Sequence, residues 1–115
     1  KDPVNMAGFV AAGLLRGDHP QIAIGEVLST PPEQRPFLLD VRTEAEFQNG
    51  HIPGAVNIPL DSLRGRLAEV PVTETIAAYC QVGQRGYLAT RILLQHGRRA
   101  LNISGGYKTY QMWQE

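Results

Sequence analysis

The sequence predicts an α/β fold in which a mostly parallel, five-stranded sheet is flanked by helices on both faces. Short apolar runs alternate along the chain with segments of helical periodicity, which is the order typical of α/β domains. The apolar runs are unbroken, which indicates strands that are covered on both faces, as in a parallel sheet. The 115 residues fit one domain, and 43% of them are hydrophobic, which is enough for a buried core.

The first 20 residues differ in character from the rest of the chain. Apolar side chains fall there roughly at helical spacing, at Met6, Phe9, Val10, Leu14 and Leu15. Gly17 is a plausible end for such a helix. We therefore expect a lead-in helix or linker over residues 1–20, and the α/β domain over residues 21–115.

Five strands and five helices are predicted in the main body. The strand candidates are the apolar runs at 22–24, 36–41, 54–60, 75–80 and 99–104. The helix candidates lie at 25–29, 43–48, 60–69, 86–96 and 106–113. Thr43 and Glu46 have the spacing of a capping box, which supports a helix start at Thr43. Residues 30–36, with three prolines, are expected to form a surface loop.

The overall charge excludes some classes of function. Lys+Arg and Asp+Glu both number 11, whereas a nucleic-acid binder usually has a basic excess. No apolar run approaches the length of a membrane span. We therefore expect neither a nucleic-acid partner nor a membrane partner.

Chemistry-bearing side chains gather at the carboxyl ends of the predicted strands, at Asp40, Asn57, Cys80 and Ser104. Ligands of open parallel sheets bind beyond these ends. Cys80 is the only cysteine of the chain, so it cannot form an internal disulfide. A free thiol fits a reducing compartment, and we expect a cytoplasmic location.

The segment that follows Cys80 predicts a cradle for an anion. A loop between a strand and a helix N-terminus directs backbone N–H groups inward, which favours a thiolate. Gly83 lets the loop reverse through positive φ, and Gly86 removes side-chain bulk at the helix start. Arg85 adds a fixed positive charge. A cysteine that merely packs in the core is the alternative. A Cys–His couple would need a histidine close in space, from among His19, His51 and His96.

Two stretches resemble the rhodanese homology domain. They are "LLDVRTEAEFQNGHIPGAVNIPL" at 38–60 and "YCQVGQRGYLATRIL" at 79–93, and the resemblance extends over nearly all of residues 21–113. Rhodaneses are sulfurtransferases, in which the loop cysteine takes up a sulfane sulfur as a persulfide and passes it to a nucleophile. The resemblance implies a donor such as thiosulfate, a polysulfide or a persulfide, and a thiol or cyanide as acceptor. It makes Cys80 catalytic and assigns substrate binding to the loop residues Gln81, Val82, Gly83, Gln84, Arg85 and Gly86.

The spacing between Cys80 and Arg85 distinguishes two chemistries within this resemblance. Related phosphatases use Cys-x5-Arg, a ring wide enough for phosphate, whereas this chain has Cys-x4-Arg. The smaller ring favours sulfur, so a small phosphatase or arsenate reductase is disfavoured. A non-catalytic module for sulfur relay or docking stays open as an alternative.

A second resemblance concerns the start of the chain and the catalytic loop. "KDPVNMAGFVA" and "GQRGYLATRIL" resemble the coenzyme A-disulfide reductases that carry a C-terminal rhodanese domain. This implies an upstream reductase that binds FAD and NAD(P)H, and makes coenzyme A persulfide a candidate partner. The chain itself has no G-x-G-x-x-G fingerprint, so we expect no cofactor and no metal in it.

Four further charged residues are candidates for the site. Asp40 and Arg42 could shape it, but we favour strand-end charges that pair with Glu46 or with backbone groups. Arg64 and Arg66 could meet an anionic substrate such as thiosulfate or coenzyme A. A solvated helix face explains these two arginines equally well.

Overall fold

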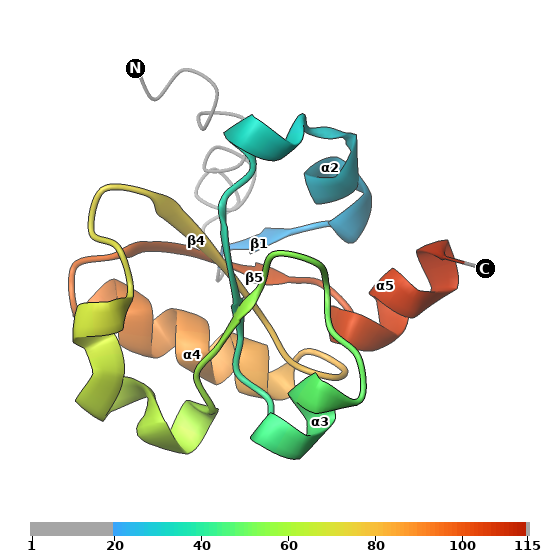
Figure 1. Cartoon of the computed structure of the whole chain (residues 1–115). Coiled ribbons are helices and arrows are strands. Elements are labelled where there is room, and N and C mark those ends of the chain that lie inside the picture. Colours follow the sequence, from blue (N-terminus) through green and yellow to red (C-terminus); the bar gives the residue numbers. More distant parts are fainter. Residues whose placement is uncertain (1–19, 115) are drawn as a thin grey trace.

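A computed structural model describes residues 20–114 and has the predicted α/β architecture (Figure 1). Its strands are β1 (Gln21–Ile22), β2 (Phe37–Asp40), β3 (Val56–Asn57), β4 (Thr75–Tyr79) and β5 (Arg99–Ile103). Its α-helices are α2 (Ile24–Ser29), α3 (Glu44–Gln48), α4 (Gln84–Gln95) and α5 (Gly106–Trp113). Two 3₁₀ segments, η1 (Pro32–Gln34) and η2 (Leu60–Glu69), complete it. The lead-in helix predicted for residues 1–20 lies outside the described residues, apart from Pro20.

The strands form one sheet in the order β1-β5-β4-β2-β3, and every neighbouring pair is parallel. Side chains alternate across it. One face packs against η2 and α4, in a cluster that contains Leu39, Ala78 and Cys80. The other face packs against α2 and α5, in a cluster that contains Ala77 and Tyr79. The sheet is therefore covered on both faces, as its unbroken apolar runs predict.

The register of the sheet brings the carboxyl ends of the central strands together. Asp40 at the end of β2 is level with Tyr79 at the end of β4. Asn102, near the end of β5, is level with Ala78. Cys80 therefore follows directly beyond the edge at which β2, β4 and β5 end (Figure 1).

The local predictions hold in part. The capping box is present, since Thr43 accepts a hydrogen bond from the Glu46 amide while the Glu46 side chain accepts from the Thr43 amide. The predicted strand at 22–24 is shorter, because Ile24 already begins α2. The predicted helix at 60–69 is a 3₁₀ segment with a kink at Arg66, where φ is −123° and ψ is 21°. Gly65 precedes that kink, and glycine weakens a regular helix.

The described part of the chain holds no helix that is both long enough and apolar enough to cross a membrane.

Candidate active site

Cys80 lies at the junction between β4 and the loop that leads into α4. Its side chain is 1% exposed and belongs to the apolar cluster under α4 and η2. The Gly83 N–H donates a hydrogen bond to Sγ, with an N to S distance of 3.0 Å. The sulfur thus accepts a hydrogen bond from one backbone donor of its own loop, and the wider anion cradle stays a prediction.

Two backbone carbonyl groups of the loop accept hydrogen bonds from α5. The first turn of α5 donates two hydrogen bonds, from Tyr107 N–H to Cys80 O at 2.7 Å and from Lys108 N–H to Gln81 O at 3.0 Å. The C=O and the N–H of a planar trans peptide point in opposite directions. With both carbonyls turned toward α5, the N–H groups of Gln81 and Val82 point to the other side of the loop.

Three glycines make this loop possible. Gly83 has a φ of 128°, so the predicted reversal through positive φ is present. Gly86 stands against Asn102, and a Cβ there would collide with the amide oxygen of that residue. Gly106 has a φ of 61°, and a Cβ on it would collide with Cys80 O and approach Gln81 within 2.8 Å. The start of α5 can therefore approach the loop closely only because it lacks a side chain.

Asp40 and Arg42 form a buried ion pair beside the loop. Their side chains are 0% and 2% exposed, and Arg42 Nη2 lies 2.6 Å from Asp40 Oδ2. Burial lowers the pKa of Arg42, but the hydrogen bonds and the charge of Asp40 outweigh it and raise that pKa overall. Arg42 Nη2 also donates to Gly50 O at 2.7 Å. The expected structural pairing with backbone is present, but Glu46 is not the partner of this pair.

Arg42 also reaches the loop that follows Cys80. Its Nη1 donates to Gln81 Oε1 at 3.2 Å, and its guanidinium carbon lies 4.3 Å from the ring centroid of Tyr107. Gln81, to which the resemblance assigns substrate binding, is turned toward Arg42, and its role toward a substrate stays a prediction. Val82, in contrast, is 63% exposed, and Gln84 is exposed as well.

Arg85 forms an ion pair with Glu46 of α3. Arg85 Nη1 and Nη2 donate to Glu46 Oε1 and Oε2, at 2.8 and 3.0 Å. The hydrogen bond from Arg85 is the largest cause that lowers the pKa of Glu46 to about 2. The capping box predicts the position of Glu46 on its helix but not this contact, because Glu46 and Arg85 meet only in the folded sheet. A direct role of Arg85 toward a bound anion stays a prediction.

The two described histidines have structural partners away from the thiol. His51 stacks on Phe47 with ring centroids 3.7 Å apart, and its Nδ1 lies 2.9 Å from Phe47 O. His96 caps the end of α4, and its Nδ1 lies 2.9 Å from Ile92 O. Within residues 20–114, neither histidine is hydrogen-bonded to Cys80. A Cys–His couple therefore has no support here, and His19 lies outside the described residues.

The remaining polar residues at the strand ends have bracing roles. Asn57 Nδ2 donates to Asp40 O and to Arg42 O, both at 3.0 Å. Ser104 Oγ donates to Gln21 Oε1 at 2.9 Å. The described residues contain no group of three or more His, Cys, Asp or Glu side chains that could hold a metal ion.

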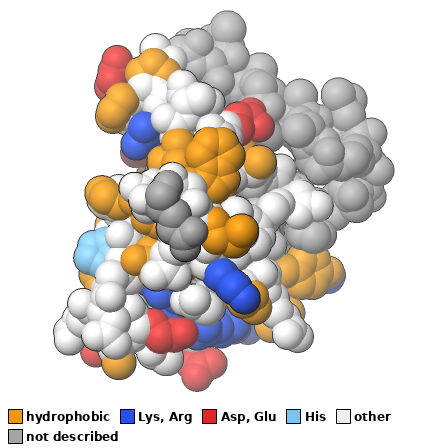
Figure 2. Space-filling model, turned by 90° about the vertical axis from the view of Figure 1, so that its right-hand side faces the viewer, with side chains coloured by type: hydrophobic (Ala, Val, Ile, Leu, Met, Phe, Trp, Pro, Cys, Tyr) orange, Lys and Arg blue, Asp and Glu red, His pale blue; other side chains and the backbone are white. Residues whose placement is uncertain are grey.

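The surface beside α5 carries both positively and negatively charged side chains. Figure 2 shows hydrophobic side chains in the middle of this face and charged side chains of both signs below them. Such a mixture does not form the single-sign field that attracts an extended polyanion.

A model of the rhodanese-like domain family matches residues 25–112. The thiosulfate sulfurtransferase PspE of Escherichia coli K12 is 33% identical over 93 residues, which are 79% of this chain and 89% of that protein. The crystal structure of reduced Bacillus anthracis CoADR-RHD has a TM-score of 0.73 and 42% identity, and the match covers 96% of this chain. The NAD-dependent persulfide reductase from A. fulgidus has a TM-score of 0.63 and 30% identity over 91% of this chain.

The relatives differ greatly in length from this chain. The match covers 20% of the Bacillus anthracis chain and 18% of the A. fulgidus chain. For three further curated relatives the covered share is 46%, 59% and 66% of their length. Domains of this kind thus occur both nearly alone and as parts of larger reductases.

Proposed function

Because this chain belongs to the rhodanese-like family, we propose that it is a sulfurtransferase that carries sulfur on Cys80 as a persulfide. The observation that carries the proposal is the position of the Cys80 sulfur, which receives the Gly83 N–H at 3.0 Å before the start of α4. Backbone donors and the positive end of a helix stabilise a thiolate, which is the reactive form in sulfur transfer.

The reaction proceeds in two displacements at sulfur. The Cys80 thiolate attacks the outer sulfur of thiosulfate, the S–S bond of the donor breaks, and sulfite leaves with the bonding electron pair. An acceptor thiolate then attacks the outer sulfur of the Cys80 persulfide, and the Cys80 thiolate leaves. Both steps are exchanges, so no external oxidant or reductant is needed. A polysulfide or persulfide donor follows the same route, with a shorter polysulfide or a thiolate as the leaving group.

We further propose that the domain serves as the tail of a larger persulfide or coenzyme A-disulfide reductase in the cytoplasm. The similarity to the two reductase structures supports this. The reductase part would bind FAD and NAD(P)H, while this chain would hold neither. A persulfide on Cys80 suits the hand-over, because its outer sulfur is open to attack by a second thiolate.

The second candidate is a non-catalytic docking module for a reductase. The 63% exposed Val82 at the tip of the loop favours contact with a partner. Incubation with thiosulfate followed by intact-mass measurement and a sulfite assay separates the two. A sulfurtransferase gains one sulfur atom and releases sulfite in turnover with a thiol, whereas a docking module does neither.

The control for this experiment is Cys80→Ser. It removes the only thiol of the chain, so both the mass gain and the sulfite release should disappear. Persistence of either signal in the serine variant would contradict the assignment of Cys80.

A further inference from the structure

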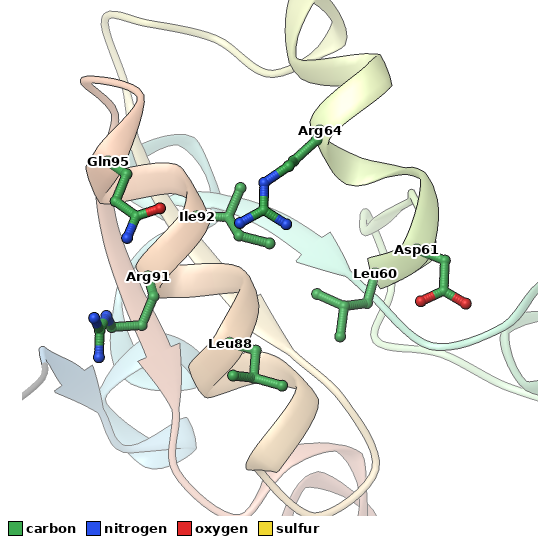
Figure 3. Close-up of a pocket in the computed structure, with 7 residues that line it drawn as sticks. All are labelled: Leu60, Asp61, Arg64, Leu88, Arg91, Ile92 and Gln95. Atoms are coloured by element: carbon green, nitrogen blue, oxygen red, sulfur yellow. The ribbon is translucent and has the colours of Figure 1, made fainter.

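A groove lies between η2 and α4, on the sheet face that also carries Cys80 (Figure 3). Its volume is about 510 Å³, which falls in the range of small-molecule sites. Leu60 from one wall and Leu88 and Ile92 from the other supply apolar surface, and the polar lining residues are Asp61, Arg64, Arg91 and Gln95.

Arg64 is an exposed side chain that lines this groove. Within residues 20–114, it is the arginine that makes neither an ion pair nor a hydrogen bond with a described residue. Figure 3 shows its side chain extending from η2 across the groove toward Ile92, while Asp61 points away. The other described arginines each donate a hydrogen bond within the protein, namely Arg35, Arg42, Arg66, Arg85, Arg91, Arg98 and Arg99.

An unpaired guanidinium above apolar side chains suits an anionic ligand with a partly apolar body. Guanidinium groups bind phosphate and carboxylate through charge-assisted hydrogen bonds, and they stack on planar groups. Arg91, on the opposite wall, points away from Arg64 in Figure 3 and donates a hydrogen bond to the Tyr87 hydroxyl at 3.0 Å, so Arg64 is the cation that faces the groove. The neighbouring Arg66 offers no such site, because Glu69 holds it at 2.8 Å.

The groove follows the helix that begins at the catalytic loop. Leu88 lies four residues beyond the first residue of α4, or about 6 Å along the helix axis. The lining then continues to Gln95, about 10 Å further. A ligand whose reactive end reached Cys80 while an anionic group met Arg64 would have to be elongated.

We propose that this groove binds the anionic end of the low-molecular-weight thiol that accepts sulfur from Cys80. The proposal rests on the sulfurtransferase function and names its acceptor class. The thiolate of the carrier attacks the outer sulfur of the Cys80 persulfide, and the Cys80 thiolate leaves with the bonding electron pair. The anionic end meanwhile binds Arg64, so its charge lowers KM rather than the barrier of the chemical step.

The anionic end could come from two sources, which kinetics distinguish. Coenzyme A carries phosphates on a nucleotide, glutathione carries carboxylates, and pantetheine has the same thiol arm as coenzyme A but no phosphate. Each thiol is offered to the protein with thiosulfate as donor, and sulfite release is followed. The anionic carrier should have a KM about tenfold below that of pantetheine, the effect of a charge-assisted contact.

Arg64→Gln tests the residue itself. It should raise the KM of the anionic carrier about tenfold, to near the pantetheine value, while the KM of pantetheine stays unchanged. Arg66→Gln is the matched control, because it removes the same charge from the same segment outside the groove. It should leave every KM unchanged. Equal KM values for all three thiols in the unmodified protein, or equal effects of the two arginine variants, would overturn the proposal.

A binding experiment separates this proposal from the sulfurtransferase function. Calorimetric titration of the Cys80→Ser variant with coenzyme A and with glutathione requires no turnover. Arg64→Gln in that background should weaken the binding of at least one of them about tenfold. If the Cys80→Ser variant binds neither thiol while the unmodified protein releases sulfite, the proposed binding site is wrong and the sulfurtransferase function stands. Binding by the Cys80→Ser variant, together with no sulfite release by the unmodified protein, would overturn the sulfurtransferase function and with it the role of the bound thiol as acceptor.

Discussion

The ends of β2 and β4 lie side by side and are built in opposite ways. At the end of β2, Asp40 and Arg42 are buried and paired with each other, and Arg42 also donates to Gly50 O and to Gln81. Beyond β4, Cys80 has a single hydrogen bond to its sulfur in the described structure, from Gly83 N–H. One strand end is closed by an ion pair, and the other holds a thiol that accepts only one hydrogen bond from the described residues. The ion pair at the end of β2 supports the loop after β4 through the hydrogen bond from Arg42 to Gln81.

The largest loss of stability should come from Arg42→Met, which removes the ion pair at the end of β2. It leaves the Asp40 carboxylate buried without its partner, which typically costs about 3–5 kcal/mol of stability. Urea unfolding measures it. Adding Asp40→Asn to Arg42→Met should recover part of the loss, because the unpaired charge is gone. A loss below about 1 kcal/mol for Arg42→Met would show that the pair does not close this end.

Gly106→Ala should disturb the brace between α5 and the loop after β4. The alanine would have to adopt a φ of 61° and would collide with Cys80 O, so we expect a loss of about 1–3 kcal/mol and slower sulfite release. Gly54→Ala is the control for backbone strain, since Gly54 has a φ of 89° but open space around it. A sulfite rate lowered equally by both variants would exclude a local effect on the loop.

Gln81→Leu removes the side-chain contact between the two strand ends. The lost hydrogen bond to Arg42 should cost about 1 kcal/mol of stability. Gln81→Glu keeps an acceptor oxygen next to the guanidinium and should retain the stability of the unmodified protein. Chemical denaturation of the two variants measures what this hydrogen bond contributes to the free energy of unfolding. If the leucine variant is as stable as the glutamate variant, the two strand ends are not coupled through this side chain.

The smallest effect should come from Glu46→Gln at the outer wall of the loop. The pKa of Glu46 is lowered from 4.5 to about 2, so its pairing stabilises the fold above pH 4.5 and is lost as the pH falls toward 2. Both partners are about one-third exposed, and solvent screening limits the gain to about 1 kcal/mol or less. Tm measured against pH should show the variant below the unmodified protein near pH 7, with the two curves converging near pH 2. A constant gap across that range would assign the effect to something other than ionisation.

Much of the fold and the position of the thiol could be predicted from the sequence. Unbroken apolar runs, the capping box at Thr43 and the glycines around Cys80 are local signals, and the structure contains their consequences. The pairings of Arg85 with Glu46 and of Arg42 with Gln81 both join residues 39 positions apart. Such contacts depend on strand order and register, which no local pattern encodes. The 3₁₀ form of η2 also escaped prediction, because its apolar spacing resembles that of an α-helix.

The hydrogen bonds from Tyr107 and Lys108 to the loop that follows Cys80 have a consequence for synthesis on the ribosome. Synthesis runs from the N-terminus, so β4 and the loop emerge before residues 105–108 that hold them. Until those residues have emerged, Cys80 O and Gln81 O lack their partners, and the amide cradle has no brace. The loop around Cys80 is therefore completed late, after the bulk of the sheet has been made. A nascent domain arrested before Gly105 would contain Cys80 without the hydrogen bonds that hold its loop.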